Sequence, residues 1–292
     1  MSVVLGKFAR RLRSLSRGQP GAGADLSSHE RITLPSAAIY VYWDFTTSVA
    51  IMEWDLTVHI DPGASVGEYL ALFNGSIDGA MCYLGLQTDM FHPEIGRGVG
   101  KGLIFSTWWS FDASDTRVAA DGFRELGAHE GRFVGIRRPY QWGRGDYRVT
   151  LARSDSEVVR GRVTDWFDLS IQPLEGTEAD FGRPAPSGPS EWIGALRFPR
   201  RFPDRAAAIE PGGLMFLEVY SGAQTWTDVV PWYVDVMAYG DSATCPSGRT
   251  EYPRPYGQHV PNVSARYDPR RARVDLRLGV EGGHKDPPGS WP

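Results

Sequence analysis

The chain has 292 residues, including 34 glycines and 21 prolines, and 41% of its residues are hydrophobic and 12% aromatic. This composition is typical of a globular protein with many turns, and the length suits one large all-β domain. The formal net charge of −4 gives no basic surface for nucleic acid, so we expect no nucleic-acid partner. No run of about 18 apolar residues occurs in the sequence, which argues against a membrane span.

The two ends of the chain differ in composition from its middle. Residues 1–30 are basic and then glycine-rich, and residues 282–292 are crowded with glycine, proline and charge. We therefore expect flexible, disordered tails at both ends of a domain that spans residues 31–281. Residues 1–30 also lack the apolar stretch of about 7 to 15 residues that a secretory signal requires, which predicts a cytoplasmic protein. An extracellular location would require a different start of the chain.

Within residues 31–281, apolar and polar residues alternate along several short segments. The clearest segment is 51–60, where Met52, Trp54, Leu56, Val58 and Ile60 alternate with Glu53, Asp55, Thr57 and His59. Similar alternation occurs at 147–151, 167–171, 214–220 and 274–280. Asn74-Gly75 is a turn signal, and either residues 154–157 or Gly161 supplies the turn between the segments 147–151 and 167–171. Short strands without helical spacing between them predict a two-sheet sandwich of the jelly-roll or lectin-like type, with a long loop at 173–190.

Residues that often carry chemistry or hold metals are scattered. The six histidines include no close pair, and Cys82 and Cys245 are too far apart in sequence for a compact metal motif. The glycine-rich segment 96–102 lacks the Ser or Thr and the following helix of a phosphate-binding loop. We therefore expect no metal and no cofactor, and we assign no catalytic residue.

Both cysteines are predicted to be free thiols, because Cys82 lies in an apolar strand and no export signal is present.

Aromatic residues mixed with polar ones give the strongest functional signal. Sugar rings stack their C–H faces on Trp or Tyr, while their hydroxyls need hydrogen-bond donors and acceptors. The mixture is densest in residues 82–151, and a further carboxylate lies on the same face of strand 214–220 as Phe216. The candidate ligand-binding residues are Gln87, Trp108, Asp112, Glu130, Trp142 and Glu218.

We predict that four of these residues, Gln87, Glu130, Trp142 and Glu218, meet around one concave surface on which Trp142 is a partly exposed platform. Two other interpretations remain open. Tryptophans of a β-sandwich commonly belong to its core, and a carboxylate inside a sheet, such as that of Glu218, is commonly paired with arginine.

The stretch from 82 to 151 resembles the bacterial family known as domain of unknown function 3472. In that family a Gly-x-Gln segment precedes a Phe-Ser-x-Trp strand, and a Glu-Gly turn and a Trp-x-x-Gly turn follow. The matching positions are 85–87, 105–108, 130–131 and 142–145, and segments 192–194 and 216–218 fit the family's downstream order. Trp109 departs from the family, which often has Asp there, and Arg132-Phe133 replaces a small Thr-Gly. The resemblance covers roughly residues 40–240 and implies no established chemistry.

The leading functional hypothesis is non-catalytic recognition of a glycan or polysaccharide. The first alternative is a glycan-active enzyme, either a glycoside hydrolase or a polysaccharide lyase, that uses carboxylates such as Glu130 and Glu218. A hydrolase needs two carboxylates about 5 to 10 Å apart across a cleft, whereas an aromatic groove with one carboxylate favours binding. The second alternative is a structural or interaction protein, which is favoured if the aromatic residues are packed in the core.

Overall fold

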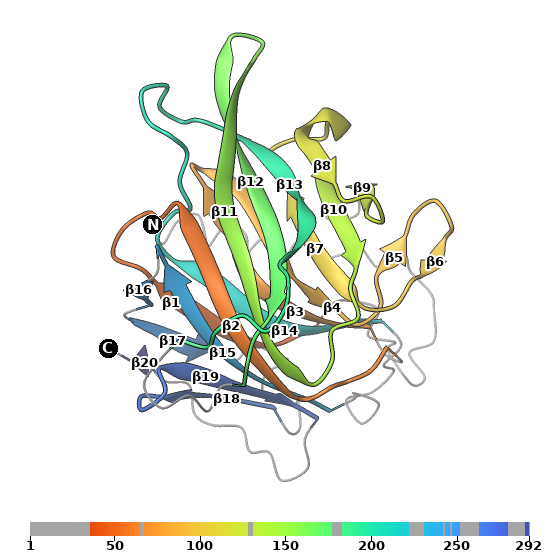
Figure 1. The fold of residues 1–292 in the computed structure, drawn as a ribbon, viewed down its shortest axis with the longest axis vertical. Helices are drawn as coiled ribbons and strands as arrows, with labels where there is room; N and C mark the ends of the chain where they lie inside the picture. Colours follow the sequence, from red (N-terminus) through yellow and green to blue (C-terminus); the bar gives the residue numbers. More distant parts are fainter. Residues whose placement is uncertain are drawn as a thin grey trace, which may run out of the picture. The chain divides into compact units, whose positions relative to one another are not determined.

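The computed structural model describes residues 36–64, 67–127, 131–176, 183–221, 231–241, 243–245, 247–251, 263–279 and 290–291. The chain divides into two units, residues 1–31 and 32–292, and every described residue belongs to the second. This unit is built from antiparallel strands, and the helical structure among its described residues is a single 3-10 turn, η1 (Ala113–Asp115) (Figure 1). The predicted all-β class is confirmed.

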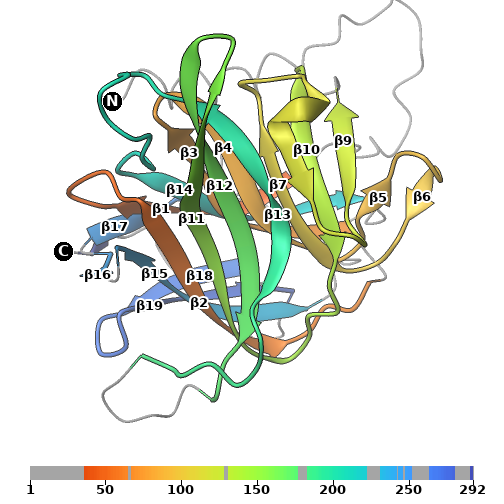
Figure 2. The same ribbon diagram turned by 45° about the horizontal axis from the view of Figure 1, so that its top comes forward.

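Two large sheets form the second unit, and both can be followed in Figures 1 and 2. Sheet A contains, in spatial order, β20 (Ser290–Trp291), β17 (Ser247–Glu251), β1 (Ser36–Asp44), β14 (Gly213–Ser221), β3 (Gly67–Ile77), β4 (Ala80–Gln87), β7 (Gly102–Thr107), β10 (Phe133–Pro139) and β9 (Phe123–Gly127). Sheet B contains β18 (Val263–Asp268), β19 (Arg273–Leu278), β15 (Trp232–Gly240), β2 (Ile51–Ile60), β11 (Gly145–Val159), β12 (Arg162–Pro173), β13 (Glu191–Pro199) and β8 (Thr116–Val118), and β16 (Ala243–Thr244) pairs with β15. A separate ribbon consists of β5 (Phe91–His92) and β6 (Arg97–Gly98).

The inner faces of the two sheets pack against each other through one continuous apolar cluster. Trp54 of sheet B contacts Phe73 of sheet A with ring centroids 6.0 Å apart, and Phe105 of sheet A stacks on Phe198 of sheet B at 6.0 Å. Because side chains of a strand point alternately to its two faces, this packing leaves every second residue on an outer face. The two-sheet sandwich expected from the alternation is confirmed.

The alternation in β14 shows how closely local pattern and burial agree. Met215, Leu217 and Val219 are buried in the core, whereas Leu214, Phe216 and Glu218 are partly exposed on the outer face. In β2 the apolar set is buried as expected except for Ile60, which is partly exposed. The polar set is not uniformly exposed, because Asp55 and Thr57 are buried as well. Other parts of the chain therefore cover the outer face of sheet B near these two residues.

The hairpin turn between β3 and β4 differs from the sequence prediction. Asn74-Gly75 lies inside β3, and the turn is made by Asp78 and Gly79, both with positive φ (48° and 90°). Positive φ at both central residues is the type I′ geometry that matches the twist of paired strands, and Asp-Gly is a favoured sequence for it. Of the two predicted positions for the next turn, Gly161 is confirmed, because Arg160 and Gly161 have positive φ between β11 and β12. The alternative, residues 154–157, is wrong, because these residues lie inside β11.

The chain ends and the cysteines complete the fold. The predicted N-terminal tail and residues 282–289 lie outside the described residues, but Ser290-Trp291 pairs with β17 instead of extending freely. Cys82 and Cys245 are free, as predicted, and both are buried, which raises the pKa of both thiols. In the described part of the chain, no helix is long and apolar enough to cross a membrane.

Candidate functional site

The outer face of sheet A carries a chain of aromatic rings that runs across its strands. Consecutive ring centroids lie 5.0 to 6.4 Å apart, mostly in edge-to-face geometry, which is the favoured arrangement for aromatic pairs. The rings belong, in order, to Tyr42, Tyr40, Phe216, Tyr69, Tyr83, Trp108 and Phe133. We call this set the aromatic chain.

Most of the aromatic chain remains accessible. Tyr69 and Phe133 are 3% and 1% exposed, whereas the other five rings are partly exposed. The outer face of an antiparallel sheet is usually covered with polar side chains, because it faces water. A connected row of partly exposed rings on such a face is therefore an unusual concentration of apolar surface, and such surfaces commonly mark binding sites.

A polar pair flanks the centre of the aromatic chain. Glu218 on β14 lies directly opposite Tyr69 on β3, and Tyr69 lies directly opposite Gln87 on β4. Residues directly opposite each other in antiparallel strands point to the same face and have Cα atoms about 5 Å apart. The carboxylate, the ring and the amide thus form one row on the outer face, although about 130 residues separate Gln87 from Glu218 in sequence.

A glycine makes room for the central ring. Gly85 lies on the outer face of β4, opposite Ala71 of β3, and a Cβ atom at Gly85 would lie 2.8 Å from Cε2 of Tyr69. The same atom would lie 2.0 Å from the carbonyl oxygen of Leu70, so only glycine fits this position. The Tyr69 ring therefore lies over the backbone at Gly85, where it contacts both Phe216 and Tyr83.

The Gln87 amide is held by a buried ion pair. Nη1 of Arg137 on β10 donates to Oε1 of Gln87 at 2.7 Å, and Nε of Arg137 donates to Oε2 of Glu125 on β9 at 2.7 Å. Arg137 and Glu125 are 7% and 8% exposed, and a second Arg137 nitrogen contacts the same carboxylate oxygen. Charges removed from water require such pairing, and the pair has no net charge of its own.

The prediction that Trp142 is a partly exposed platform is wrong. Trp142 is 1% exposed and stacks on Trp232 with ring centroids 5.2 Å apart. Lys101 is also buried, with Nζ 4.3 Å from the centre of the Trp142 ring and 3.0 Å from the Trp142 carbonyl oxygen. Because the segment at 140–144 folds into the sandwich, Trp142 packs in the core and shows no ring face to solvent.

The remaining predicted residues fall into three groups. Trp108 belongs to the aromatic chain, and Gln87 and Glu218 flank it. Asp112 is exposed and caps η1, because its Oδ1 accepts from the Ser114 amide at 2.9 Å, a bond that lowers the pKa of Asp112. Glu130 lies outside the described residues, so its part in the predicted convergence stays a prediction.

Sequence reasoning missed Tyr40, Tyr42, Tyr69 and Tyr83 of the aromatic chain, as well as Arg137. Tyr40 and Tyr42 alternate with buried residues of β1, so period-two alternation could have placed them on the outer face. Tyr69 was harder to place, because a β-bulge between Ala71 and Phe73 breaks the alternation of β3. Arg137 gives no local signal, because only the register of β10 brings it beside Gln87.

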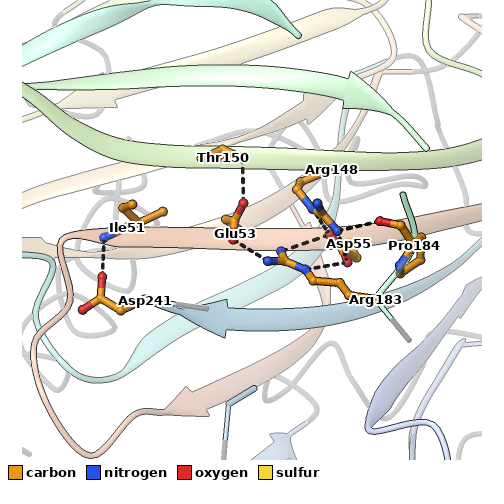
Figure 3. Close-up of polar contacts among 8 residues, drawn as sticks. All are labelled: Ile51, Glu53, Asp55, Arg148, Thr150, Arg183, Pro184 and Asp241. Carbon is orange, nitrogen blue, oxygen red and sulfur yellow. Dashed lines mark hydrogen bonds and ion pairs between the residues drawn. The ribbon is translucent and has the colours of Figure 1, made fainter. Parts of the chain in front are cut away.

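The outer face of sheet B is built from charge instead of aromatic rings. Asp55 on β2 is 1% exposed and accepts from Nε of Arg148 at 2.7 Å and from Nε of Arg183 at 3.1 Å. Arg183 also reaches Glu53 at 2.6 Å, and Arg148 donates to the carbonyl oxygen of Pro184, as Figure 3 shows. The segment that carries Arg183 and Pro184 is thus fastened to the sheet and covers Asp55.

Farther along the same face, two carboxylates meet. Asp235 on β15 lies directly opposite Asp275 on β19, and His59 Nε2 is 2.9 Å from Asp235 Oδ2. Burial, followed by the nearby Asp275, raises the pKa of Asp235 to about 6. Among the described residues, no group of three or more His, Cys, Asp or Glu side chains has the geometry to hold a metal ion.

No family model matches the chain, and no curated protein matches it. Among solved structures, it is similar to a Scytalido-glutamic peptidase with a peptide-based transition-state analogue, at 7% identity and a TM-score of 0.40. It is also similar to SCP-B, a member of the Eqolisin family of peptidases, in complex with the tripeptide Ala-Ile-His, at 7% identity and a TM-score of 0.38. Each match covers 85% of this chain and 98% of the other, and at these scores neither supports an inference about function.

Proposed function

We propose that the outer face of sheet A binds a carbohydrate without transforming it. The observation that carries this proposal is the aromatic chain, five of whose seven rings are partly exposed beside a carboxylate and an amide. Aromatic rings offer large, stiff apolar surfaces at small entropic cost, while Glu218 and Gln87 supply hydrogen-bonding groups for hydroxyls. The membership of the chain in the family of domain of unknown function 3472 stays a prediction beside this proposal.

Binding is preferred over catalysis because of the polar groups on this face. Glycoside hydrolysis requires two carboxyl groups across the scissile bond, one of which supplies a proton. In the row that flanks Tyr69, the residue on the far side of the ring from Glu218 is Gln87, whose amide cannot act as a general acid. The nearby carboxylate of Glu125 forms a buried salt bridge with Arg137.

A printed glycan array probed with the purified full-length chain tests the proposal. We expect at least one array glycan to bind and Trp108→Ala to weaken that binding about tenfold, equivalent to about 1.4 kcal/mol. Trp192→Ala is the matched control, because Trp192 is 37% exposed on sheet B and should leave binding unchanged. Thermal melting of both variants checks that the fold is retained.

Two results would contradict the proposal. The first is the absence of binding to every array glycan, which would favour a structural or interaction protein. The second is an equal effect of Trp108→Ala and Trp192→Ala, which would move binding away from the aromatic chain. Release of reducing sugar from a bound glycan would instead support the glycan-active enzyme, and loss of that release in Glu218→Gln would place its chemistry on this face.

A further inference from the structure

Two aspartates of sheet B lie directly opposite each other on neighbouring strands. Asp235 on β15 pairs with Asp275 on β19, so both side chains point to the outer face of the sheet, with Cα atoms about 5 Å apart. Like charges at directly opposite positions destabilise a sheet. Two ionised carboxylates would therefore weaken the pairing of β15 with β19 unless something removes their repulsion.

One oxygen of each carboxyl group already has a partner. Asp235 Oδ2 lies 2.9 Å from Nε2 of His59, and Asp275 Oδ2 accepts from Nη2 of Arg277 at 3.2 Å. Within the described part of the chain, the Oδ1 atom of each group is buried and has no hydrogen-bond partner. A buried acceptor without a donor costs free energy, and here two such acceptors belong to directly opposite residues.

The nearest hydroxyl group does not supply a donor to this pair. Thr57 on β2 lies directly opposite Asp235 on its other side, but its single O–H donates to Oδ1 of Asp146 at 2.7 Å. Nη1 of Arg273 donates to the same Thr57 oxygen at 2.9 Å, so this nitrogen is directed at Thr57. Thr57 therefore stabilises Asp146 and leaves Oδ1 of Asp235 without a donor.

The other titratable and charged groups around the pair come from four strands. Arg266 on β18 is exposed and lies directly opposite Asp275, and Tyr233 on β15 stacks on His59 with ring centroids 4.3 Å apart. The full set is His59, Tyr233, Arg266, Arg273 and Arg277. Although three of these are arginines, neither Oδ1 atom accepts a hydrogen bond from any of them.

A proton satisfies both oxygens at once. Both Oδ1 atoms are closed to solvent, so a water molecule cannot donate to them. A carboxyl group that keeps its proton donates through its O–H to the neighbouring carboxylate, which leaves one negative charge in place of two. Burial, followed by the hydrogen bond to Asp275, raises the pKa of Asp235 to about 6, in agreement with this geometry.

We propose that Asp235 and Asp275 share one proton between their Oδ1 atoms, and that this proton is a pH-sensitive clamp that holds β19 against β15. β18 and β19 form one edge of sheet B, and β15 joins them to the rest of the sheet. The protonated pair adds a side-chain hydrogen bond to this connection, whereas the ionised pair adds repulsion. The clamp lies on sheet B and is independent of ligand binding by the aromatic chain.

Hydrogen exchange of the β19 backbone amides in the full-length chain measures how firmly this edge is held. We expect their protection factors to fall about tenfold between pH 5 and pH 8. A carboxyl group with a pKa of about 6 keeps roughly nine-tenths of its proton at pH 5 and almost none at pH 8, whereas one with the ordinary value of 3.8 is ionised at both. The stabilisation is therefore present at low pH and is lost as the pH rises through about 6.

Two reciprocal variants should keep the clamp closed at every pH. In Asp235→Asn the new amide donates an N–H to Asp275 without titrating, so we expect equal β19 protection at pH 5 and pH 8. Asp275→Asn puts the donor on the other strand and should have the same effect. Asp155→Asn is the matched control and should show the full tenfold fall, because Asp155 pairs with Arg117 at an exposed site.

His59 is the neighbour whose own titration would imitate the clamp. His59→Gln keeps a hydrogen-bond donor for Oδ2 of Asp235 but removes the imidazole, and we expect the tenfold fall to persist in this variant. Disappearance of the fall would assign the proton to the imidazole and would overturn the inference.

A carbon-13 NMR titration of the aspartate carboxyl carbons detects the shared proton directly. The signals of Asp235 and Asp275 are those missing from the spectra of the two Asn variants. We expect both signals to shift in the step near pH 6, because a shared proton belongs to the pair and not to either residue. Three results would each overturn the inference: two independent titrations at ordinary aspartate pH values, a pH-dependent β19 protection that persists in both Asn variants, or equal protection at pH 5 and pH 8 in the unmodified chain.

Discussion

The two outer faces of the sandwich arise from the same alternation of residues but differ in what they present. The outer face of sheet A carries the aromatic chain, and the buried ion pair of Arg137 with Glu125 lies beside it. Sheet B shows networks of ion pairs, in which the carboxylate of Asp55 is buried beneath Arg148 and Arg183. The ring-bearing face leaves apolar area accessible, whereas the Asp55 cluster satisfies its charges internally.

This difference supports the proposal that the outer face of sheet A is the one that binds a ligand. Partly exposed rings gain free energy when a ligand removes them from water. Fully paired charges gain nothing comparable, because any ligand has to replace bonds that already exist. Substitutions on the two faces should therefore separate into those that change binding and those that change stability.

The largest expected effect lies between the two faces, at Trp142. Trp142→Ala should lower the free energy of unfolding by about 3 to 5 kcal/mol, the usual cost of truncating a core tryptophan. The loss should be large because the ring fills the space between Trp232 and Lys101. Urea unfolding measures it, with Trp192→Ala as the exposed control, and a change similar to that of the control would contradict the core assignment.

The next effect belongs to sheet B. Asp55→Ala should cost roughly 3 kcal/mol, the lower end of the range for breaking a buried ion pair, because Glu53 still pairs with Arg183. Denaturant unfolding tests the stability, and the glycan array should show unchanged binding. Reduced glycan binding with an intact fold would contradict the expectation that substitutions on sheet B change stability alone. Asp155→Ala is the control, because the pair of Asp155 with Arg117 is exposed.

The smallest effect concerns pH. The folded-state pKa of Asp235, about 6, lies above the ordinary value of 3.8, so the folded chain binds this proton more tightly than the unfolded chain does. The contribution of Asp235 to stability is therefore present in full below about pH 4 and is lost as the pH rises through about 6. Asp235→Asn should flatten this part of the stability profile, whereas Asp155→Asn should not.

The groups around Asp235 come from three strands: His59, Tyr233, Asp275, Arg273 and Arg277. Unfolding free energies measured at pH 4, 5, 6 and 7 provide the test. An unchanged slope in Asp235→Asn would assign the proton uptake to another of these groups.

Much of the fold could be predicted from local patterns. Alternation in β2 and β14 identified the buried side chains, because a strand places successive residues on opposite faces. Of the two turn positions predicted between β11 and β12, the one at Gly161 is correct, and the other, residues 154–157, lies inside β11. The β3–β4 turn was misplaced because Asn-Gly and Asp-Gly both occur within a few residues, and only the pairing of β3 with β4 shows which of them closes the hairpin.

The site could be predicted only in part. Gln87, Trp108 and Glu218 were identified from the mixture of aromatic and polar residues, and the structure puts all three on one face. Trp142 was misassigned because its segment is irregular, so no alternation shows whether its ring points inward or outward. Asp112 caps η1, a role that its sequence does not distinguish from ligand binding, and its predicted contact with a ligand stays a prediction.

The sequence by itself determined the all-β class and the two faces of the main strands, and it predicted the residues that would contact a glycan. Only the tertiary structure decided the neighbours, because strand order is set by how the sheets bury their apolar faces together. In sheet A that order inserts β14 beside β3, and β3 beside β4, which puts Glu218, Tyr69 and Gln87 in one row. The register of β10 against β7 places Arg137 beside Gln87, and this contact fixes the direction in which the amide oxygen points.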